Sequence, residues 1–452
     1  MSRATPARRR ALALVSERRR RGARARDLLR SCEGLDALAP RDRALCTRLV
    51  LGATAARGEL DRVLGSHLSP GARLEPRVRD ALQLAAFELL YLDTRDDVCV
   101  SQGVELVRGV APRAAGLANA VLRRVAQQDA PALARARGRV ADGTADVADL
   151  ARVGALPEWL CGRLVASLGP EGAARLCASA LGPCGAYVAA NRARTSAARA
   201  RELLAQAGCD PRDAGLPGAF ELGEPSRLAP SGLVGSVDVL PCDLAAQRVA
   251  HALGCRPGEK VLEVGQGRAT KTLLMEGCAC AAGGPCEVVG VELDPRKSDL
   301  AARRVRDAGL AGHVRCVAMD ARGLAAPDAL PDVPEGGFDL VFVDAPCTGT
   351  GTLARHPEIA WSLSPEDPQR LAVLQLEVLR AAAARVRPGG RLAYATCSVL
   401  DEEDRQVVDA LLAGPVGEGL ELVGEGLVCA PRGDSHYLAT LRRGPAAVSC
   451  RR

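Results

Sequence analysis

The sequence has few aromatic residues and no long apolar run. Phe, Trp and Tyr together make up 2% of its 452 residues, so the hydrophobic cores must be built mainly from Leu, Val and Ala. No apolar stretch is long enough to cross a bilayer, and arginines interrupt the apolar part of the N-terminus, which argues against a signal peptide. We therefore expect a cytoplasmic protein that does not enter a membrane.

The seventeen cysteines lack the spacing of a disulfide framework or a zinc site. Their number is odd and they are scattered along the chain, so we expect free thiols. The close group Cys278, Cys280 and Cys286 contains no CxxC pair and has no histidine nearby. A loop of small residues explains this group better than a metal does, and we expect no metal.

Neither sign of charge dominates strongly, since the net charge is +6. Hydrophobic residues at 48% and charged residues at 25% are ordinary for a globular protein, and the length allows two or three domains. Arginines crowd the first thirty positions and recur at Arg303, Arg304 and Arg306. This suits a polyanion such as RNA, although solvated helix faces explain such runs equally often.

The first part of the chain, from Arg8 to Ala126, has apolar residues at steps of three and four, which predicts several short helices. The expected apolar faces are Leu45, Leu49, Ala53, Ala56, Leu60 and Val63; then Val78, Leu82, Ala85, Leu89 and Leu90; then Leu117, Val121, Leu122 and Val125.

A polar, Ala-rich and Asp-rich connector, partly helical, is expected next, at 127–156. Two short helices should then flank a stop at Gly169 and Pro170, and "AYVAANRARTSAARARELLAQAG" reads as strand, turn and helix. These elements predict a small α+β module.

From Asp243 onward, strands and helices alternate, which predicts a mostly parallel sheet covered on both faces. The pattern shows no internal repeat, and a helix is expected over Pro368–Val386. The expected strands are Lys260–Val264, Glu287–Leu293, Val314–Ala318, Asp339–Val343 and Arg391–Thr396.

Acidic residues and a glycine turn follow successive strands of this sheet. The turn with Gly265 and Gly267 opens a helix, where backbone N–H groups favour a negative ligand group. Glu292 ends the next strand and could accept hydrogen bonds from a ribose, and Asp320 follows the third strand and could accept from an adenine amine. A full dinucleotide fingerprint is missing, so the order favours S-adenosylmethionine over NAD, although each motif alone is weak.

Two cysteines also follow strands. Asp344 and Cys347 come after the fourth strand, and Cys397 comes after the fifth, so both thiols should lie at the edge of the cofactor cleft. Buried cysteines are usually inert, but thiolate addition to C6 of cytosine would make C5 nucleophilic enough to accept a methyl group. Asp344 is placed to supply or share the N3 proton, and a second thiol could assist release.

The motifs "DAPCTGTGTLARHPEIAW" and "YATCSVLDEED" closely resemble those of RNA 5-methylcytosine methyltransferases, and the whole chain is similar to the bacterial RsmB (Sun) type. The resemblance implies an α/β Rossmann-like class I methyltransferase with a mostly parallel seven-stranded sheet, preceded by an all-α NusB-like domain and a small α+β RNA-binding module. The expected bounds are 1–130 for the NusB-like domain, 131–156 for a linker, 157–240 for the RNA-binding module and 241–445 for the methyltransferase domain.

The resemblance also assigns roles. Cys397 would be the nucleophile, Cys347 would promote product release, and Asp344 would contact the base. Lys271 would meet the methionine carboxylate or the base, with a solvated lysine as the alternative. The residues expected to hold the cofactor are Gly265, Gln266, Gly267, Arg268, Ala269, Thr270, Lys271, Glu292, Asp320 and Asp344.

The chain departs from the family's first motif, because Arg268 stands in place of proline, and Ala269 and Thr270 stand in place of two glycines. Bulk beside the cofactor is therefore greater. His356 and Glu358 would order their turn or approach RNA, and Trp361 is expected to pack rather than to stack on a base.

The resemblance implies a monomeric enzyme that uses S-adenosylmethionine to methylate cytosine C5 in 16S ribosomal RNA. Two alternatives remain open from the sequence: a transfer RNA cytosine-C5 methyltransferase, and a non-catalytic RNA-binding or ribosome-assembly protein.

Overall fold

The computed structural model describes residues 4–326, 328–330, 334 and 336–445. Its chain divides into two compact units. Unit 1 comprises residues 1–182 together with 356–365, and unit 2 comprises residues 183–355 together with 366–452. None of the described helices is long and apolar enough to span a membrane.

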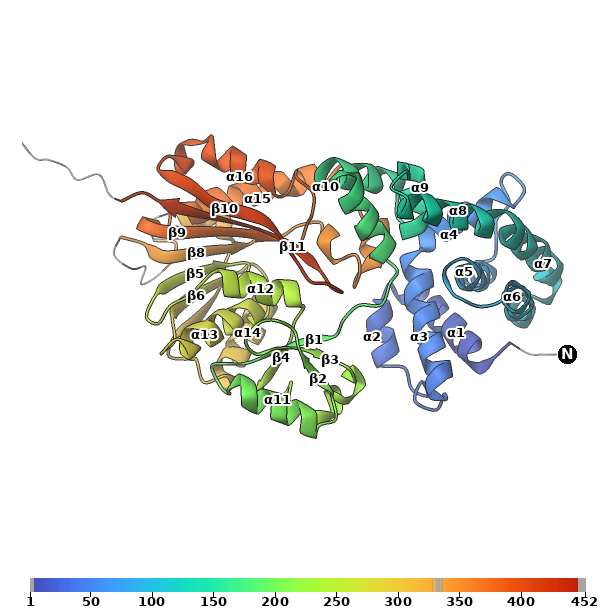
Figure 1. The fold of residues 1–452 in the computed structure, drawn as a ribbon, viewed down its shortest axis with the longest axis horizontal. Helices are drawn as coiled ribbons and strands as arrows, with labels where there is room; N and C mark the ends of the chain where they lie inside the picture. The colour runs from blue at the N-terminus through green and yellow to red at the C-terminus, as the bar shows by residue number, and fades with distance from the viewer. Residues whose placement is uncertain (1–3, 327, 331–333, 335, 446–452) are drawn as a thin grey trace, which may run out of the picture. The chain divides into compact units, whose positions relative to one another are not determined.

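Unit 1 is helical (Figure 1). Its α-helices are α1 (Pro6–Arg21), α2 (Ala25–Arg30), α3 (Pro40–Ala55), α4 (Arg57–Ser66), α5 (Pro76–Tyr91), α6 (Asp96–Val110), α7 (Ala115–Arg124), α8 (Ala130–Ala141), α9 (Val147–Gly154) and α10 (Glu158–Ser179). Three short helical turns complete it: η1 (Pro112–Ala114), η2 (Val125–Asp129) and η7 (Pro357–Trp361).

Two expectations for the helical region need correction. The face expected over residues 45–63 belongs to two helices, because α3 ends at Ala55 and α4 begins at Arg57. Leu117 is 43% exposed instead of buried. The buried stripe of α7 and the following turn runs through Ala118, Val121, Leu122 and Val125, and Leu117 lies one position off it.

The segment expected as a connector contains α8 and α9. Asp146 caps α9 in a capping box with Asp149, which fixes where that helix begins. Helix α10 is interrupted at Gly169, whose φ of 69° and ψ of 169° are not helical, and Pro170 follows. The expected pair of helices around a Gly-Pro stop is therefore confirmed.

Unit 2 begins with a small four-stranded antiparallel sheet in the order β2-β3-β1-β4. The strand, turn and helix expected from the sequence are β1 (Tyr187–Ala190) and α11 (Ala197–Gln206). The other elements of this part are β2 (Pro211–Asp213), β3 (Ala219–Leu222), η3 (Pro225–Arg227), η4 (Ala229–Ser231) and β4 (Val239–Pro241).

The larger sheet of unit 2 has seven strands in the order β10-β11-β9-β8-β5-β6-β7. Strands β9, β8, β5, β6 and β7 are parallel, and β11 and β10 join as antiparallel strands, which confirms the expected fold class. The strands are β5 (Lys260–Val264), β6 (Glu287–Glu292), β7 (Val314–Ala318), β8 (Phe338–Asp344), β9 (Val386–Thr396), β10 (Leu420–Cys429) and β11 (Ser435–Arg443).

Helices cover both faces of this sheet (Figure 1). One buried cluster joins the strands to α12 (Leu244–Ala252), α13 (Thr270–Ala281) and α14 (Pro295–Asp307). A second cluster, on the opposite face, joins them to α15 (Asp367–Ala383) and α16 (Arg405–Leu412). Short turns η5 (Ala321–Ala325), η6 (Thr350–Thr352) and η8 (Pro415–Gly417) complete the unit.

Candidate active site

The two motif cysteines lie side by side at the carboxyl ends of neighbouring parallel strands. Cys347 follows β8 and Cys397 follows β9, and their Sγ atoms are 3.2 Å apart. The backbone N–H of Cys397 also donates to Cys347 Sγ at 3.3 Å. Contact with Cys397 and burial raise the pKa of Cys347 well above its ordinary value, so its thiol stays protonated at neutral pH.

Lys271 and Asp344 form an ion pair beside the thiols. Lys271 Nζ is 2.6 Å from Asp344 Oδ2, and both side chains are largely buried. Burial acts to lower the pKa of Lys271, but the negative charges of Asp344 and Cys397 outweigh it and raise that pKa. The ammonium is therefore charged and close enough to Cys397 to act on it electrostatically.

Glycine shapes the turn after β5. Gly265 has φ +79°, and a Cβ at this position would lie 2.2 Å from the backbone oxygen of Asp344. Glycine therefore lets the ends of β5 and β8 approach each other. Ala269, the N-cap of α13, also adopts the left-handed conformation with φ 58°, which is strained for a residue with a Cβ.

The departures at Arg268 and Thr270 are held from α14. The Arg304 guanidinium donates to the backbone oxygen of Arg268 and, at 2.9 Å, to Thr270 Oγ1. Burial and the charge of Arg268 lower the pKa of Arg304. The turn is thus fixed by a side chain from the neighbouring helix.

Glu292 ends β6 and faces this turn. Its Oε2 accepts from the backbone N–H of Gly267 at 2.8 Å, and its Oε1 accepts from that of Asp294 at 3.0 Å. Each carboxylate oxygen can accept a further hydrogen bond. Glu292 is therefore oriented by the backbone and keeps the capacity to bind two hydroxyl groups.

Two other expected cofactor residues are engaged within the protein. Asp320 forms an ion pair with Arg322 at 2.6 Å, and hydrogen bonding to Arg322 lowers the pKa of Asp320. Gln266 is 4% exposed, and its Nε2 donates to Thr272 Oγ1 at 3.3 Å. The Gln266 side chain lies over Gly290, where a Cβ would approach it to 2.0 Å, so only the backbone of Gln266 remains for a ligand.

Sequence reasoning assigned no role to three buried titratable residues around the site, although it noted the acid Glu263 late in its strand. Glu263 on β5 accepts from the Thr272 hydroxyl, and burial raises the pKa of Glu263 to about 8. His436 is the second residue of β11, and burial together with the charges of Lys271 and Arg355 lowers the pKa of His436 to about 3. The third, Glu403, lies in the quoted motif, but no sequence pattern shows that it is buried.

Trp361 packs within unit 1. Its ring lies against Gly58, where a Cβ would be 2.1 Å from the ring, and its Nε1 donates to the backbone oxygen of Ala155 at 2.9 Å. His356 Nδ1 lies 3.7 Å from Glu358 Oε1, ahead of η7. These contacts account for the order of the turn and for the expected packing of Trp361.

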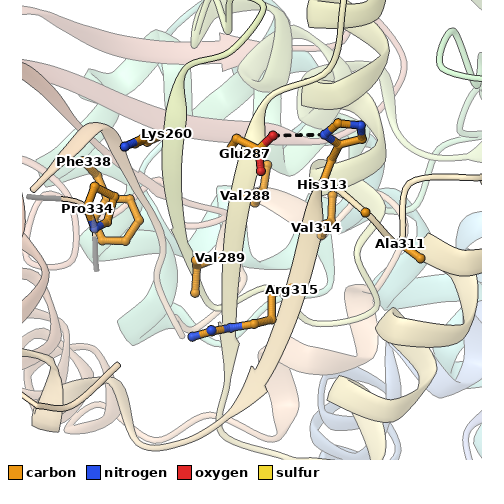
Figure 2. A pocket seen from close by; sticks show the side chains of 11 residues that line it. Lys260, Glu287, Val288, Val289, Ala311, His313, Val314, Arg315, Pro334 and Phe338 are labelled. Carbon is orange, nitrogen blue, oxygen red and sulfur yellow. Dashed lines mark hydrogen bonds and ion pairs between the residues drawn. The ribbon is translucent and has the colours of Figure 1, made fainter. Parts of the chain in front are cut away.

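A cavity of about 580 Å³ lies at the opposite end of the parallel strands (Figure 2). Its lining includes Lys260, Glu287 and Phe338, the first residues of β5, β6 and β8, together with the His313 side chain that pairs with Glu287. It is therefore separate from the thiols. The described cysteines are free, and the described residues contain no group of three or more His, Cys, Asp or Glu side chains that could hold a metal ion.

Two protein families match different parts of this chain. The family described as 16S rRNA methyltransferase RsmB/F matches residues 250–419, and the NusB family matches residues 5–127. Ribosomal RNA small subunit methyltransferase B of Thermus thermophilus is 35% identical over 434 residues, which cover 94% of this chain and 94% of that protein. The chain belongs to the RsmB/F family of methyltransferases.

A second relative and two solved structures are also similar to this chain. The protein of the same description from Xanthomonas campestris is 30% identical over 393 residues, covering 82% of this chain and 80% of that one. The crystal structure of PH0851 has a TM-score of 0.73 at 19% identity and covers 98% of this chain and 100% of that chain. NSun6 from Pyrococcus horikoshii with SFG has a TM-score of 0.53 at 15% identity, covering 64% and 98%. These two structures show the shared fold.

Proposed function

We propose that the protein methylates C5 of a cytosine in small-subunit ribosomal RNA, with S-adenosylmethionine as the methyl donor and a covalent bond between Cys397 and C6 of the base. The observation that carries this proposal is the 3.2 Å separation of the Cys347 and Cys397 sulfur atoms beside the Lys271–Asp344 ion pair. Methylation at a nucleophilic ring nitrogen or hydroxyl would need no thiol, so a pair of thiols supports a pyrimidine carbon as the acceptor.

In the proposed reaction, the Cys397 thiolate adds to C6 of the cytosine. The C5=C6 double bond breaks, and N3 takes the proton that Asp344 shares with the Lys271 ammonium. C5 is then electron-rich and takes the methyl group. Loss of the C5 proton to a base, cleavage of the bond from C6 to Cys397 and return of the N3 proton to the Lys271–Asp344 pair restore the neutral ring and the thiolate.

Cys347 would act in the release step. It lies in contact with Cys397 Sγ and is held protonated by its surroundings, so it can donate to the departing sulfur. A protonated neighbour stabilises a thiolate by hydrogen bonding, which makes that sulfur a better leaving group.

The turn Gly265–Gly267 and Glu292 fit S-adenosylmethionine, which supplies an electrophilic methyl group when bound. Glu292 retains acceptor capacity for the ribose hydroxyls, and the glycine turn leaves its backbone approachable. Asp320 could receive the adenine amine once its pairing with Arg322 is shared. We propose that the remaining residues of this turn, through Lys271, contribute backbone contacts and charge.

The deciding experiment is bisulfite sequencing of small-subunit ribosomal RNA and transfer RNA after incubation with the protein and S-adenosylmethionine. The proposal requires a new methylated cytosine in the ribosomal RNA. Methylation confined to transfer RNA would favour the other enzyme. RNA binding without any S-adenosylmethionine binding in calorimetry would favour a non-catalytic assembly protein.

A further inference from the structure

Glu403 is a fully buried carboxylate that receives hydrogen bonds from four donors. Its Oε1 accepts from the backbone N–H of Thr348 at 2.8 Å and from Gln375 Nε2 at 3.0 Å. Its Oε2 accepts from Ser398 Oγ at 2.6 Å and from the Thr348 hydroxyl. None of the ion pairs recorded among the described residues includes Glu403, and burial raises its pKa.

The residues that Glu403 holds directly follow the two thiols in the chain. Thr348 comes after Cys347, and Ser398 comes after Cys397. One carboxylate therefore ties together the loops that carry both sulfur atoms.

Further contacts join the same two loops. Thr350 Oγ1 lies 3.0 Å from Ser398 Oγ, and the backbone N–H of Gly351 donates to the Cys397 carbonyl at 2.9 Å. Gln375, which Glu403 binds, donates to the Pro346 carbonyl at 2.9 Å from the other side of Cys347. Ser398 and Gln375, which both donate to Glu403, take part in two of these contacts.

A carboxylate suits this position better than any other side chain. All four partners donate, and a carboxylate can accept all four bonds. A glutamine has one acceptor oxygen. Its amide nitrogen would either face Thr348 N–H and Gln375 Nε2, which cannot accept, or force the Thr348 and Ser398 hydroxyls to turn and accept. An aspartate is shorter by one methylene.

We propose that Glu403 is a positioning residue that sets the separation of Cys347 and Cys397 by holding Thr348 and Ser398. The inference rests on the proposed function, because the distance between the two thiols matters for catalysis only if both act on one base. Glu403 itself would not contact the substrate.

The test measures the thiol pair without RNA or S-adenosylmethionine. Phenylarsine oxide condenses with two adjacent thiols, forming two As–S bonds and releasing water, and it needs both sulfur atoms within reach of one arsenic. Cys161 and Cys177, whose sulfur atoms are 4.0 Å apart, are a second thiol pair that can bind the arsenical. The part of the arsenical binding that is lost in Cys347→Ser is therefore assigned to the pair Cys347 and Cys397, and is called site-pair capture.

We expect Glu403→Gln to slow site-pair capture about tenfold and to lower kcat by about a hundredfold with the KM for S-adenosylmethionine unchanged, because small misplacements of reacting groups have effects of this size. The matched control is Glu59→Gln, another buried carboxyl, which lies in unit 1 and should leave site-pair capture unchanged. Unchanged capture in Glu403→Gln would overturn the inference even if the unsubstituted protein methylates RNA.

A second variant covers the case in which Glu403→Gln does not fold. Ser398→Ala removes one bond to Glu403 and keeps the carboxylate, so it should slow site-pair capture by a smaller factor. Capture at the unsubstituted rate in Ser398→Ala would also count against the inference. If capture responds as expected but the protein methylates no RNA, the positioning role stands and the proposed function fails.

Discussion

Lys271 Nζ lies 2.6 Å from Asp344 Oδ2, and this ion pair joins the start of α13 to the end of β8. The pair brings a cation next to the thiols and holds a carboxylate where a base would arrive. This relationship links the cofactor turn to the chemistry proposed for the cysteines.

Asp344→Asn removes the shared proton and the partner of Lys271. We expect kcat for RNA methylation to fall by about a hundredfold or more, because general acid catalysis contributes factors of this size. Single-turnover methylation assays measure the effect. Asp339→Asn, at the opposite end of the same strand, where Asp339 pairs with Arg387, should leave kcat unchanged.

The two cysteines should respond differently to removal. We expect Cys397→Ala to abolish methylation without a covalent RNA adduct, and Cys347→Ala to let such an adduct accumulate, because release would fail after addition. Denaturing gels of protein with labelled RNA detect the adduct, and the exposed Cys429→Ala provides the control. Equal loss of activity without adduct in both variants would contradict the assigned roles.

Alanine substitutions at Gly265 and Gly267 distinguish the cost of backbone strain from the cost of a steric clash. Both have positive φ, but a Cβ at Gly265 would meet the Asp344 backbone at 2.2 Å, whereas one at Gly267 would meet its nearest atom at 3.9 Å. We expect Gly267→Ala to lower the free energy of unfolding by about 1–2 kcal/mol, and Gly265→Ala to lower it by about 1–3 kcal/mol more. Urea denaturation measures both, and equal losses would show that the strand ends can separate freely.

Glu263 should make the free energy of unfolding fall as the pH rises from about 4.5 to about 8. Burial raises its folded-state pKa from an ordinary value of 4.5 to about 8, so its contribution is complete below pH 4.5 and is lost as the pH rises through 8. Glu263→Gln cannot ionise, and we expect its stability relative to the unsubstituted protein to increase between pH 5 and pH 9. Urea denaturation across that range tests this. In the control variant Glu421→Gln, which changes an exposed carboxyl, the difference in unfolding free energy from the unsubstituted protein should not change with pH.

Local patterns predicted much of the sheet. The bounds of β5 and β7 match the sequence prediction, because each is a short apolar run between polar or glycine-rich turns. Strand β9 was expected from Arg391 but begins at Val386, and α15 ends at Ala383 rather than at Val386. The intervening "RPGG" reads as a turn, yet Val386 pairs with Phe338 across an irregular register.

The side-chain arrangement was less accessible to sequence reasoning. The order of strands explains why Cys347 and Cys397 meet, since both follow neighbouring parallel strands. The roles of Gln266 and Glu403 depend on contacts with residues far away in the chain. A sequence motif shows that an acid is present but does not show whether it faces solvent or lies beneath two loops.

The chain passes between its two compact units three times, after Gly182, Arg355 and Pro365. An expression clone that starts at Pro183 would therefore carry residues 356–365 without Gly58 and Ala155, the surface on which the Trp361 indole rests. Such a fragment would expose an apolar ring just downstream of Cys347. A single truncation after Gly182 therefore changes the surroundings of residues 356–365 in the remaining fragment. The roles of the two units are better tested with point substitutions or with both fragments present together.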